Sequence, residues 1–344
     1  MMSRKVTRFL SAIVMAGLMF SAAEANTVYV IEDMDSYPEW TFGAYMVSGN
    51  QLNLGSKKTA PNRGGGPVGL AVSEAKNRVF VSYEFSGALD VFYANTLEPY
   101  STPQIVLPGA NNAAGIVGSE ARDRLYAIDR GNTQVYVYDF DTNAITAEQF
   151  NVRKGAIGIT VWGNKLYVTY GDSEIDIYDL DNPGTLLDTL ITTAAGGRMA
   201  IAVDGSDENN VLVYTTNTSQ GPVNSSILSQ YNVNTDVEVT LDLGRDGRGV
   251  SVLPSLGLVY VAVGDNSDSV APEIRVYDSA LTGMIDSDPL VVGKGPTDVV
   301  AGEGIIFLPE GTVAVPTLSE WAAIAMIVLL GGSAFIAIRR RTLI

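Results

Sequence analysis

The sequence predicts an all-β fold, because three short patterns recur along its length. One is a run of β-branched and aromatic residues such as Val79-Phe80-Val81, whose centres from Phe80 onward lie 41 to 48 residues apart. Another is an apolar pair that runs into a turn, as in Val137-Tyr138 before Asp139. The third is a stretch of small residues ahead of each unit, as in Gly66-Pro67-Val68-Gly69. Repeats of about this length are typical of the four-stranded blades of a β-propeller.

Each pattern corresponds to one strand of the blade. The small residues suit the first strand, which lines the central channel where neighbouring blades crowd together. First strands are predicted at 66–70, 114–116, 156–159, 198–201, 248–250 and 295–299. Second strands are predicted at 27–30, 79–81, 125–127, 166–168, 211–213, 259–261 and 305–307. Third strands are predicted at 44–45, 91–92, 137–138, 177–178, 230–231 and 276–277.

The number of blades follows from the two incomplete ends of the repeat. Five full units begin at Gly66, Ala114, Ala156, Arg198 and Arg248. The stretch 27–65 lacks a first strand and 296–309 lacks third and fourth strands, so together they can complete one more blade and close the ring. This predicts a six-bladed domain over residues 26–309. Seven blades stay open, because 27–30 and 305–307 both fit a second-strand slot, and an irregular β-sandwich is the structural competitor.

The repeats and the composition both limit the class of function. The units resemble the YVTN-type β-propeller repeats of bacterial surface proteins. The chain has no cysteine and no histidine, which excludes disulfides, thiolate chemistry and imidazole catalysis. Residues 26–319 carry 36 acidic and 16 basic side chains, so nucleic acid is not expected as a partner. No metal site and no cofactor are predicted, although the oxygen-rich loops 204–210 and 265–268 leave Ca²⁺ open.

Both ends of the chain are predicted to direct its export. Residues 1–25 begin with basic side chains, continue through an apolar stretch and end on Ala23-Glu24-Ala25, which is typical of a cleaved signal peptide. The uncharged stretch 322–338 is long enough for one transmembrane helix. Arg339, Arg340 and Arg341 would stop transfer and keep the tail 339–344 in the cytoplasm, with the folded body outside.

A short motif lies between the body and this apolar stretch, within the linker 310–321. It reads Val315-Pro316-Thr317-Leu318-Ser319-Glu320-Trp321. With the apolar stretch and the arginines, it resembles the IPTLxxWG-CTERM sorting signal, a relative of the PEP-CTERM signals. Val315 replaces the usual Ile, and Ala322 replaces the Gly after Trp321. The resemblance implies a Gram-negative bacterium, an inner-membrane precursor, and recognition of the motif as substrate by an exosortase-type transpeptidase.

Candidate binding residues in the body lie where three of the units begin. Arg198, Arg248 and Asp298 occupy these positions and would converge near one mouth of the channel, where they could bind a small polar ligand. We expect a non-catalytic propeller that is displayed on the cell surface or secreted and contacts a protein or polysaccharide. The alternatives are an enzyme of the lactonase or quinoprotein kind and a periplasmic scaffold that stays anchored in the membrane.

Overall fold

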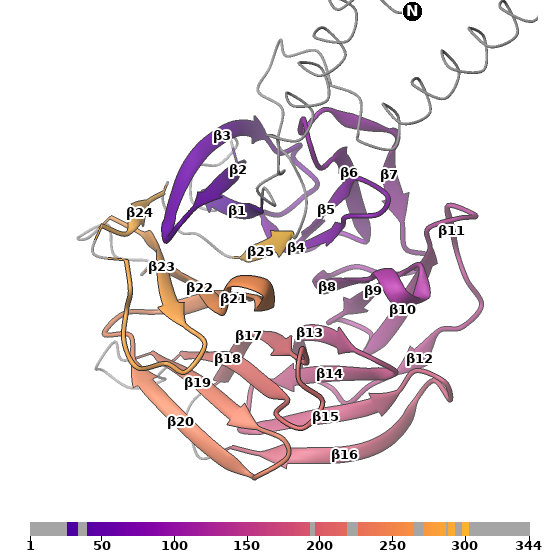
Figure 1. Ribbon diagram of the computed structural model, residues 1–344. Coiled ribbons are helices and arrows are strands. Elements are labelled where there is room, and N and C mark those ends of the chain that lie inside the picture. Colours follow the sequence, from indigo (N-terminus) through magenta and orange to yellow (C-terminus); the bar gives the residue numbers. More distant parts are fainter. Residues whose placement is uncertain are drawn as a thin grey trace, which may run out of the picture. The chain divides into compact units, whose positions relative to one another are not determined.

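The computed structural model describes residues 26–33, 40–192, 197–218, 226–264, 271–286, 288–292 and 298–302. All of them lie in the first of the chain's two units, Met1–Phe307, whereas the second, Leu308–Ile344, lies outside the described residues. The described strands form six antiparallel sheets arranged in a ring (Figure 1). The prediction of an all-β, six-bladed propeller is therefore confirmed.

Each blade has four strand positions, counted outward from the channel. Blade 1 contains β25 (Val299–Gly302), β1 (Thr27–Asp33), β2 (Thr41–Ser48) and β3 (Gln51–Thr59). Blade 2 contains β4 (Pro67–Ser73), β5 (Arg78–Tyr83), β6 (Ala88–Tyr93) and β7 (Pro99–Val106). Blade 3 contains β8 (Ala113–Ser119), β9 (Arg124–Asp129), β10 (Gln134–Asp139), and β11 (Ala144–Ile145) and β12 (Phe150–Asn151), which share the outer position.

The other three blades repeat the arrangement. Blade 4 contains β13 (Ala156–Trp162), β14 (Lys165–Tyr170), β15 (Glu174–Asp179) and β16 (Thr185–Ile191). Blade 5 contains β17 (Gly197–Asp204), β18 (Leu212–Thr218), β19 (Ile227–Asn232) and β20 (Val237–Asp242). Blade 6 contains β21 (Gly247–Leu253), β22 (Leu258–Val263), β23 (Glu273–Asp278) and β24 (Leu290–Val291).

Helices within the described ranges are two single 3₁₀ turns, η1 (Glu120–Arg122) and η2 (Pro254–Leu256). No helix in that part of the chain is long and apolar enough to cross a membrane. The predicted signal peptide (1–25), linker (310–321), transmembrane helix (322–338) and tail (339–344) all fall outside the described residues.

Blade 1 closes the ring by joining the two ends of the repeat. β1 takes the second-strand position, and β25 supplies the inner strand, with Val28 opposite Ala301 and Val30 opposite Val299. One slot is thus filled by 27–33, which decides the count in favour of six blades. The competing second strand at 305–307 lies outside the described residues.

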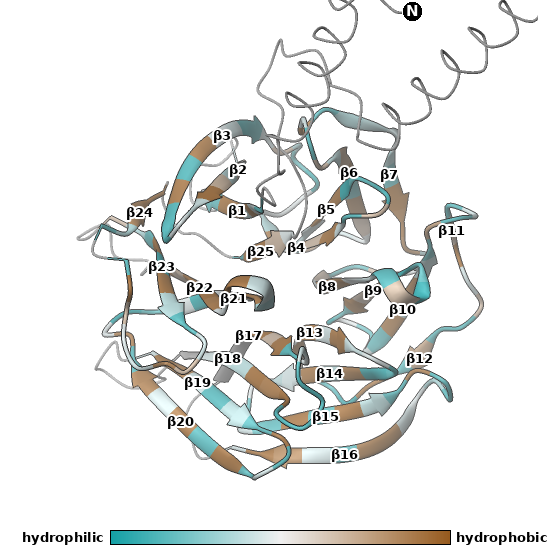
Figure 2. Ribbon diagram, viewed as in Figure 1, coloured by the Kyte–Doolittle hydropathy of each residue, from teal (hydrophilic) through white to brown (hydrophobic). Residues whose placement is uncertain are grey.

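The hydrophobic core is divided among the junctions between neighbouring blades. Between blades 1 and 2, for example, the buried side chains of Tyr29 and Phe42 pack against those of Val79 and Phe92, and the two phenyl rings lie 4.8 Å apart. Consecutive residues of a second strand face the two neighbouring junctions in turn, so that Val79 and Val81 lie in this core and Phe80 lies in the core between blades 2 and 3. Apolar segments occur in the strands of all six blades (Figure 2). The Tyr and Phe residues that recur in the sequence therefore pack in the interfaces between neighbouring blades.

Candidate binding site in the central channel

The inner strands enclose a cavity of about 400 Å³ at the centre of the ring. All six blades contribute to its wall, through β4, β8, β13, β17, β21 and β25. Much of that wall is apolar and includes Leu70, Ile116, Ile159, Val203 and Val250. A cavity of this size falls within the range of about 300 to 1,000 Å³ found for small-molecule sites, which also combine apolar walls with a few polar groups. The channel can therefore accommodate a small ligand.

Polar side chains gather at the mouth where the inner strands begin, which we call the Arg248 mouth. It comprises Glu84, Asn112, Arg130, Arg248 and Asp298. The first and second strands of a blade are antiparallel, so residues at the start of a first strand lie beside residues at the end of the second strand. The N–H of Glu84, just after β5, donates to Gly66 O at 2.9 Å, and the N–H of Arg130, just after β9, donates to Asn112 O at 2.9 Å.

Asp298 links blade 1 to blade 2 at this mouth. Its Oδ2 accepts a hydrogen bond of 2.7 Å from the N–H of Leu70, and its Oδ1 accepts one of 2.9 Å from the N–H of Val299. Its side chain is partly buried against the channel wall, and this burial raises the pKa of the carboxyl to about 7 against the opposing effect of the two N–H donors. Asp298 can therefore change its charge near neutral pH.

The structure brings two of the three predicted binding residues to the same cavity. Arg248, the second residue of β21, and Asp298 both line the channel. The backbones of the two segments are closely packed, since a Cβ on Gly249 would lie 2.7 Å from Asp298 Cα. Arg198 is the second residue of β17, the position that Arg248 has in β21, but its side chain lies outside the described part.

Sequence reasoning missed the rest of the Arg248 mouth. Glu84 and Arg130 directly follow the observed strands β5 and β9, three residues beyond the predicted ends at 81 and 127, and Asn112 directly precedes β8. The signal that could have found them is a polar residue just outside each predicted strand, at the end that the first strand enters.

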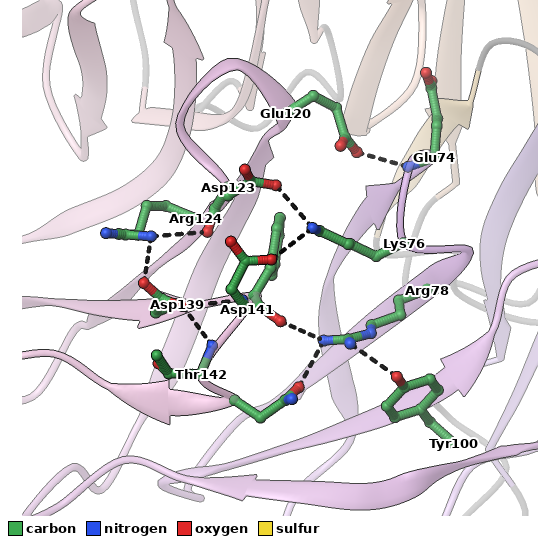
Figure 3. A network of polar contacts seen from close by, with 12 residues as sticks. Glu74, Lys76, Arg78, Tyr100, Glu120, Asp123, Arg124, Asp139, Asp141 and Thr142 are labelled. Atoms are coloured by element: carbon green, nitrogen blue, oxygen red, sulfur yellow. Dashed lines mark hydrogen bonds and ion pairs between the residues drawn. The ribbon is translucent and has the colours of Figure 1, made fainter.

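The opposite mouth carries Glu74 and Glu120, and polar contacts behind it join blades 2 and 3 (Figure 3). Glu120 Oε1 accepts a 2.6 Å hydrogen bond from the N–H of Glu74. Lys76 Nζ lies 3.1 Å from Asp123 Oδ1 and 2.8 Å from Asp141 Oδ1. These contacts fix the turns of blades 2 and 3 beside the second mouth.

The buried Arg78 extends this network (Figure 3). It donates to Tyr100 Oη at 2.8 Å and to Asn143 Oδ1 at 2.9 Å. Nearby, the N–H of Thr142 donates to Asp139 and holds the pKa of that carboxyl below its usual value. The guanidinium thus ties the third-strand turn of blade 3 to blade 2.

The loops considered for Ca²⁺ show ordinary turn contacts where they are described. Asp204 Oδ1 accepts a hydrogen bond of 3.0 Å from the N–H of Ser206, and Asp207 Oδ1 accepts one of 2.9 Å from the N–H of Asn209. Over the described ranges, no three Asp, Glu, His or Cys side chains are grouped closely enough to hold a metal ion. The second loop, 265–268, lies outside those ranges.

Fold and cavity together define a six-bladed β-propeller with a closed ring and a central channel. At the end of the chain, residues 313–341 match the family described as the IPTL-CTERM motif. The match covers all seven residues of the predicted sorting motif and the three arginines, so the prediction of this motif is confirmed. The sorting motif and the propeller fold together support a propeller that is exported and sorted to the cell surface.

Solved structures resemble the body in fold. One is the crystal structure of a nidogen/laminin complex, with a TM-score of 0.64 and 11% identity over 82% of this chain and 100% of that chain. Another is hydrazine synthase from Kuenenia stuttgartiensis, with a TM-score of 0.52 and 14% identity over 67% of this chain and 68% of that chain. No curated protein sequence matches the chain. At these identities the likeness concerns the fold alone.

Proposed function

We propose that this protein is a non-catalytic binding propeller that reaches the cell surface or the medium by C-terminal sorting. The secretion machinery would export it with residues 1–25 as signal peptide. A precursor would then be held in the inner membrane by residues 322–338. An exosortase-type transpeptidase would cleave within Val315 to Trp321 and release the body or transfer it to another anchor.

The match of residues 313–341 to the IPTL-CTERM motif carries this proposal. Proline at 316 suits a protease substrate, because it disfavours helix at Val315 and would end a helix that runs outward from the apolar stretch. An extended segment at the membrane surface is accessible to a membrane enzyme, whereas a helix continuing outward would not be. The nucleophile belongs to the processing enzyme, so the motif residues act as substrate.

The mass of the mature protein from its native cell tests the sorting step. We expect a C-terminus within Val315 to Trp321. An intact end at Ile344 would instead identify a permanently anchored periplasmic scaffold. As a matched pair of variants, replacing both Pro316 and Trp321 by Ala should leave the tail attached, whereas Ser319→Ala should be processed normally, because Ser319 occupies a variable position of the motif.

The Arg248 mouth is the proposed contact for a polar ligand, either a small molecule or an exposed group of a protein or polysaccharide. Arg198, Arg248 and Asp298 would supply charge, and the apolar wall would take the body of the ligand. We expect Arg248→Ala to reduce retention of the protein on polysaccharide from the native cell surface. Lys58→Ala, on the outer strand of blade 1, is the control and should not change it.

An enzyme of the lactonase or quinoprotein kind is the second candidate, and Asp298 favours it. A carboxyl with a pKa of about 7 in an enclosed cavity could act as a general acid or base. A panel of lactones and alcohols with Ca²⁺ present decides between the two. We expect no turnover; turnover that disappears in Asp298→Asn would establish the enzyme instead.

A further inference from the structure

The outer edge of blade 5 is a regular strand of six residues that has no lysine, proline or bulge. β20 pairs with β19 through six consecutive residue pairs, from Val237 opposite Asn232 to Asp242 opposite Ile227, with no shift of register. Its sequence, Val-Glu-Val-Thr-Leu-Asp, contains no lysine, arginine or proline. Soluble proteins normally blunt such an edge with these residues, a bulge or a short strand, because exposed backbone groups recruit other strands.

The other five outer edges each show one of these devices. β3 carries Lys57 and Lys58, and β7 carries Pro99 and Pro103. In blade 3 the outer position is split between β11 and β12, which have two residues each. β16 is interrupted by a register shift, and β24 is only two residues long. Among the described outer strands, β20 is thus the one that is regular and has neither lysine nor proline, and its charged residues are the acids Glu238 and Asp242.

The backbone of β20 offers hydrogen-bonding groups to a further strand. The N–H of Leu243 donates to Ser226 O at 2.8 Å, so this residue is directed toward β19. Because the direction alternates along an antiparallel strand, Val237, Val239 and Leu241 are directed the same way. The N–H and C=O groups of the residues between them, Glu238, Thr240 and Asp242, are therefore directed away from the sheet.

The side chains of β20 indicate the chemistry of its partner. Val237 and Val239 are 55% and 40% exposed, although both are large apolar residues. Glu238 lies between them and accepts a hydrogen bond from Ser229 Oγ, and Asp242 ends the strand. Blade 5 and its connections, residues 197–244, contain six acidic residues and one basic residue, Arg198, which lies on the inner strand β17. Such a blade attracts a basic strand and repels a second acidic copy of itself.

We propose that β20 is a docking edge for an extended segment of a basic protein partner, in which apolar and basic side chains alternate. In an antiparallel pairing, valines would lie opposite Val237 and Val239, and lysines opposite Glu238 and Asp242. Main-chain hydrogen bonds would provide the affinity, and this side-chain pattern would provide the specificity. The proposal concerns the rim of the propeller and does not depend on the channel.

A synthetic peptide tests the proposal with the full chain kept in a mild non-ionic detergent. The probe is a fluorescent peptide containing Lys-Val-Thr-Val-Lys-Val, and the control contains Glu-Val-Thr-Val-Glu-Val. Fluorescence anisotropy should show at least tenfold tighter binding of the basic peptide, and the difference should shrink as salt is raised. Equal binding of both peptides, or of neither, would overturn the proposal.

Variants locate the binding edge. Val239→Lys places on the edge a long cationic side chain that repels the basic peptide. Thr240→Pro removes an outward N–H while leaving the hydrogen bonds to β19 intact. Each should weaken binding of the basic peptide at least tenfold. The control is Leu186→Lys on β16, where the wild-type leucine is 52% exposed, and it should bind like wild type. Unchanged binding by folded Val239→Lys would rule β20 out.

Two further measurements test whether the peptide binds at β20 and whether a second copy of the chain binds there instead. Hydrogen exchange of the full chain should slow at Glu238 to Asp242 when the basic peptide is added and nowhere else on an outer strand. Analytical ultracentrifugation should show a monomer without peptide. A dimer that Val239→Lys disperses would make a second copy the natural occupant and would overturn the basic partner.

Discussion

Asp90 is the centre of a buried polar cluster that lies between blades 1 and 2. It is 2% exposed, accepts a hydrogen bond of 2.7 Å from Tyr83 Oη, and lies 2.6 Å from a terminal nitrogen of Arg63. Blade 4 repeats the arrangement, with Tyr178 Oη donating to Asp176 Oδ2 at 3.2 Å and Arg153 Nε 3.5 Å from the same oxygen. The two clusters differ in the source of the tyrosine, since Tyr83 ends the second strand of its blade and Tyr178 belongs to the third strand.

Removing this carboxylate should destabilise the protein strongly. Asp90→Ala leaves Arg63 without its anion and Tyr83 without its acceptor, which we expect to cost about 2 to 4 kcal/mol, given that Arg63 is itself partly exposed. Urea unfolding followed by tryptophan fluorescence measures this cost. The control is Glu98→Ala, because the Lys58–Glu98 pair is largely exposed and should contribute less than about 1 kcal/mol. Equal effects would refute a special role for burial.

Asp298 should make stability depend on pH in a recognisable way. Its pKa rises from 3.8 to about 7 in the folded protein, so between these values the folded state holds a proton that the unfolded state releases. The stabilising contribution of this group is complete below about pH 4 and is lost as the pH rises through 7. Relative to Asp298→Asn, the melting temperature of the wild type should therefore fall between about pH 4 and 7 and level off above pH 7. A constant difference across that range would contradict the raised pKa.

Sequence periodicity predicts which residues lie on a strand near the channel, but it does not predict contacts made by loop side chains. Arg248 and Asp298 could be assigned to the channel because they lie on or next to strands that the repeat locates. The pairing of Arg63 with Asp90 could not, because it joins a loop to a third strand 27 residues away. Periodicity reports which face a residue occupies, but not which loop side chain reaches it.

At the scale of elements, inner-strand glycines allow neighbouring blades to approach closely. A Cβ on Gly115 of β8 would lie 2.6 Å from Ile157 O of β13, and one on Gly69 of β4 would lie 2.6 Å from Ala114 O of β8. The small-residue stretches of the sequence therefore have the geometric cause that was predicted for them. The exposed outer edge of β20 could not be predicted in this way, because the repeat patterns locate the first three strands of a blade and not the fourth.

Gly115→Ala should separate blades 3 and 4. The neighbouring group is backbone and cannot rotate away, so we expect a loss of about 1 to 3 kcal/mol, measured by urea unfolding. Gly171→Ala is the matched control, since a Cβ there meets no atom within 4 Å and the backbone needs no positive φ. That variant should be neutral or slightly stabilising. Similar losses in both would show that glycine flexibility, rather than close packing, is what matters.

At the scale of the whole molecule, the ring is held closed by one short strand. β25 joins β1 through four residue pairs, and Asp298 just before it binds the N–H of Leu70 in blade 2. Val28 and Val30 of β1 are both fully buried. A propeller that lacked β25 would expose them along an unpaired inner edge, next to the channel. Closure is therefore expected to stabilise all six blades and not only the one that contains the joint.

Two truncations of the chain test this expectation. A chain that ends after Thr297 lacks β25, whereas one that ends after Thr312 keeps it and lacks residues 313–344, which include the match to the sorting motif. We expect the longer chain to be monomeric and to melt in one cooperative transition. The shorter chain should aggregate on size-exclusion chromatography and lose that transition, because the open edge of β1 recruits other strands and blades 1 and 2 lose their contact through Asp298. If the two chains melted at the same temperature, the blades would be equally stable without ring closure, and closure would serve only to shape the channel.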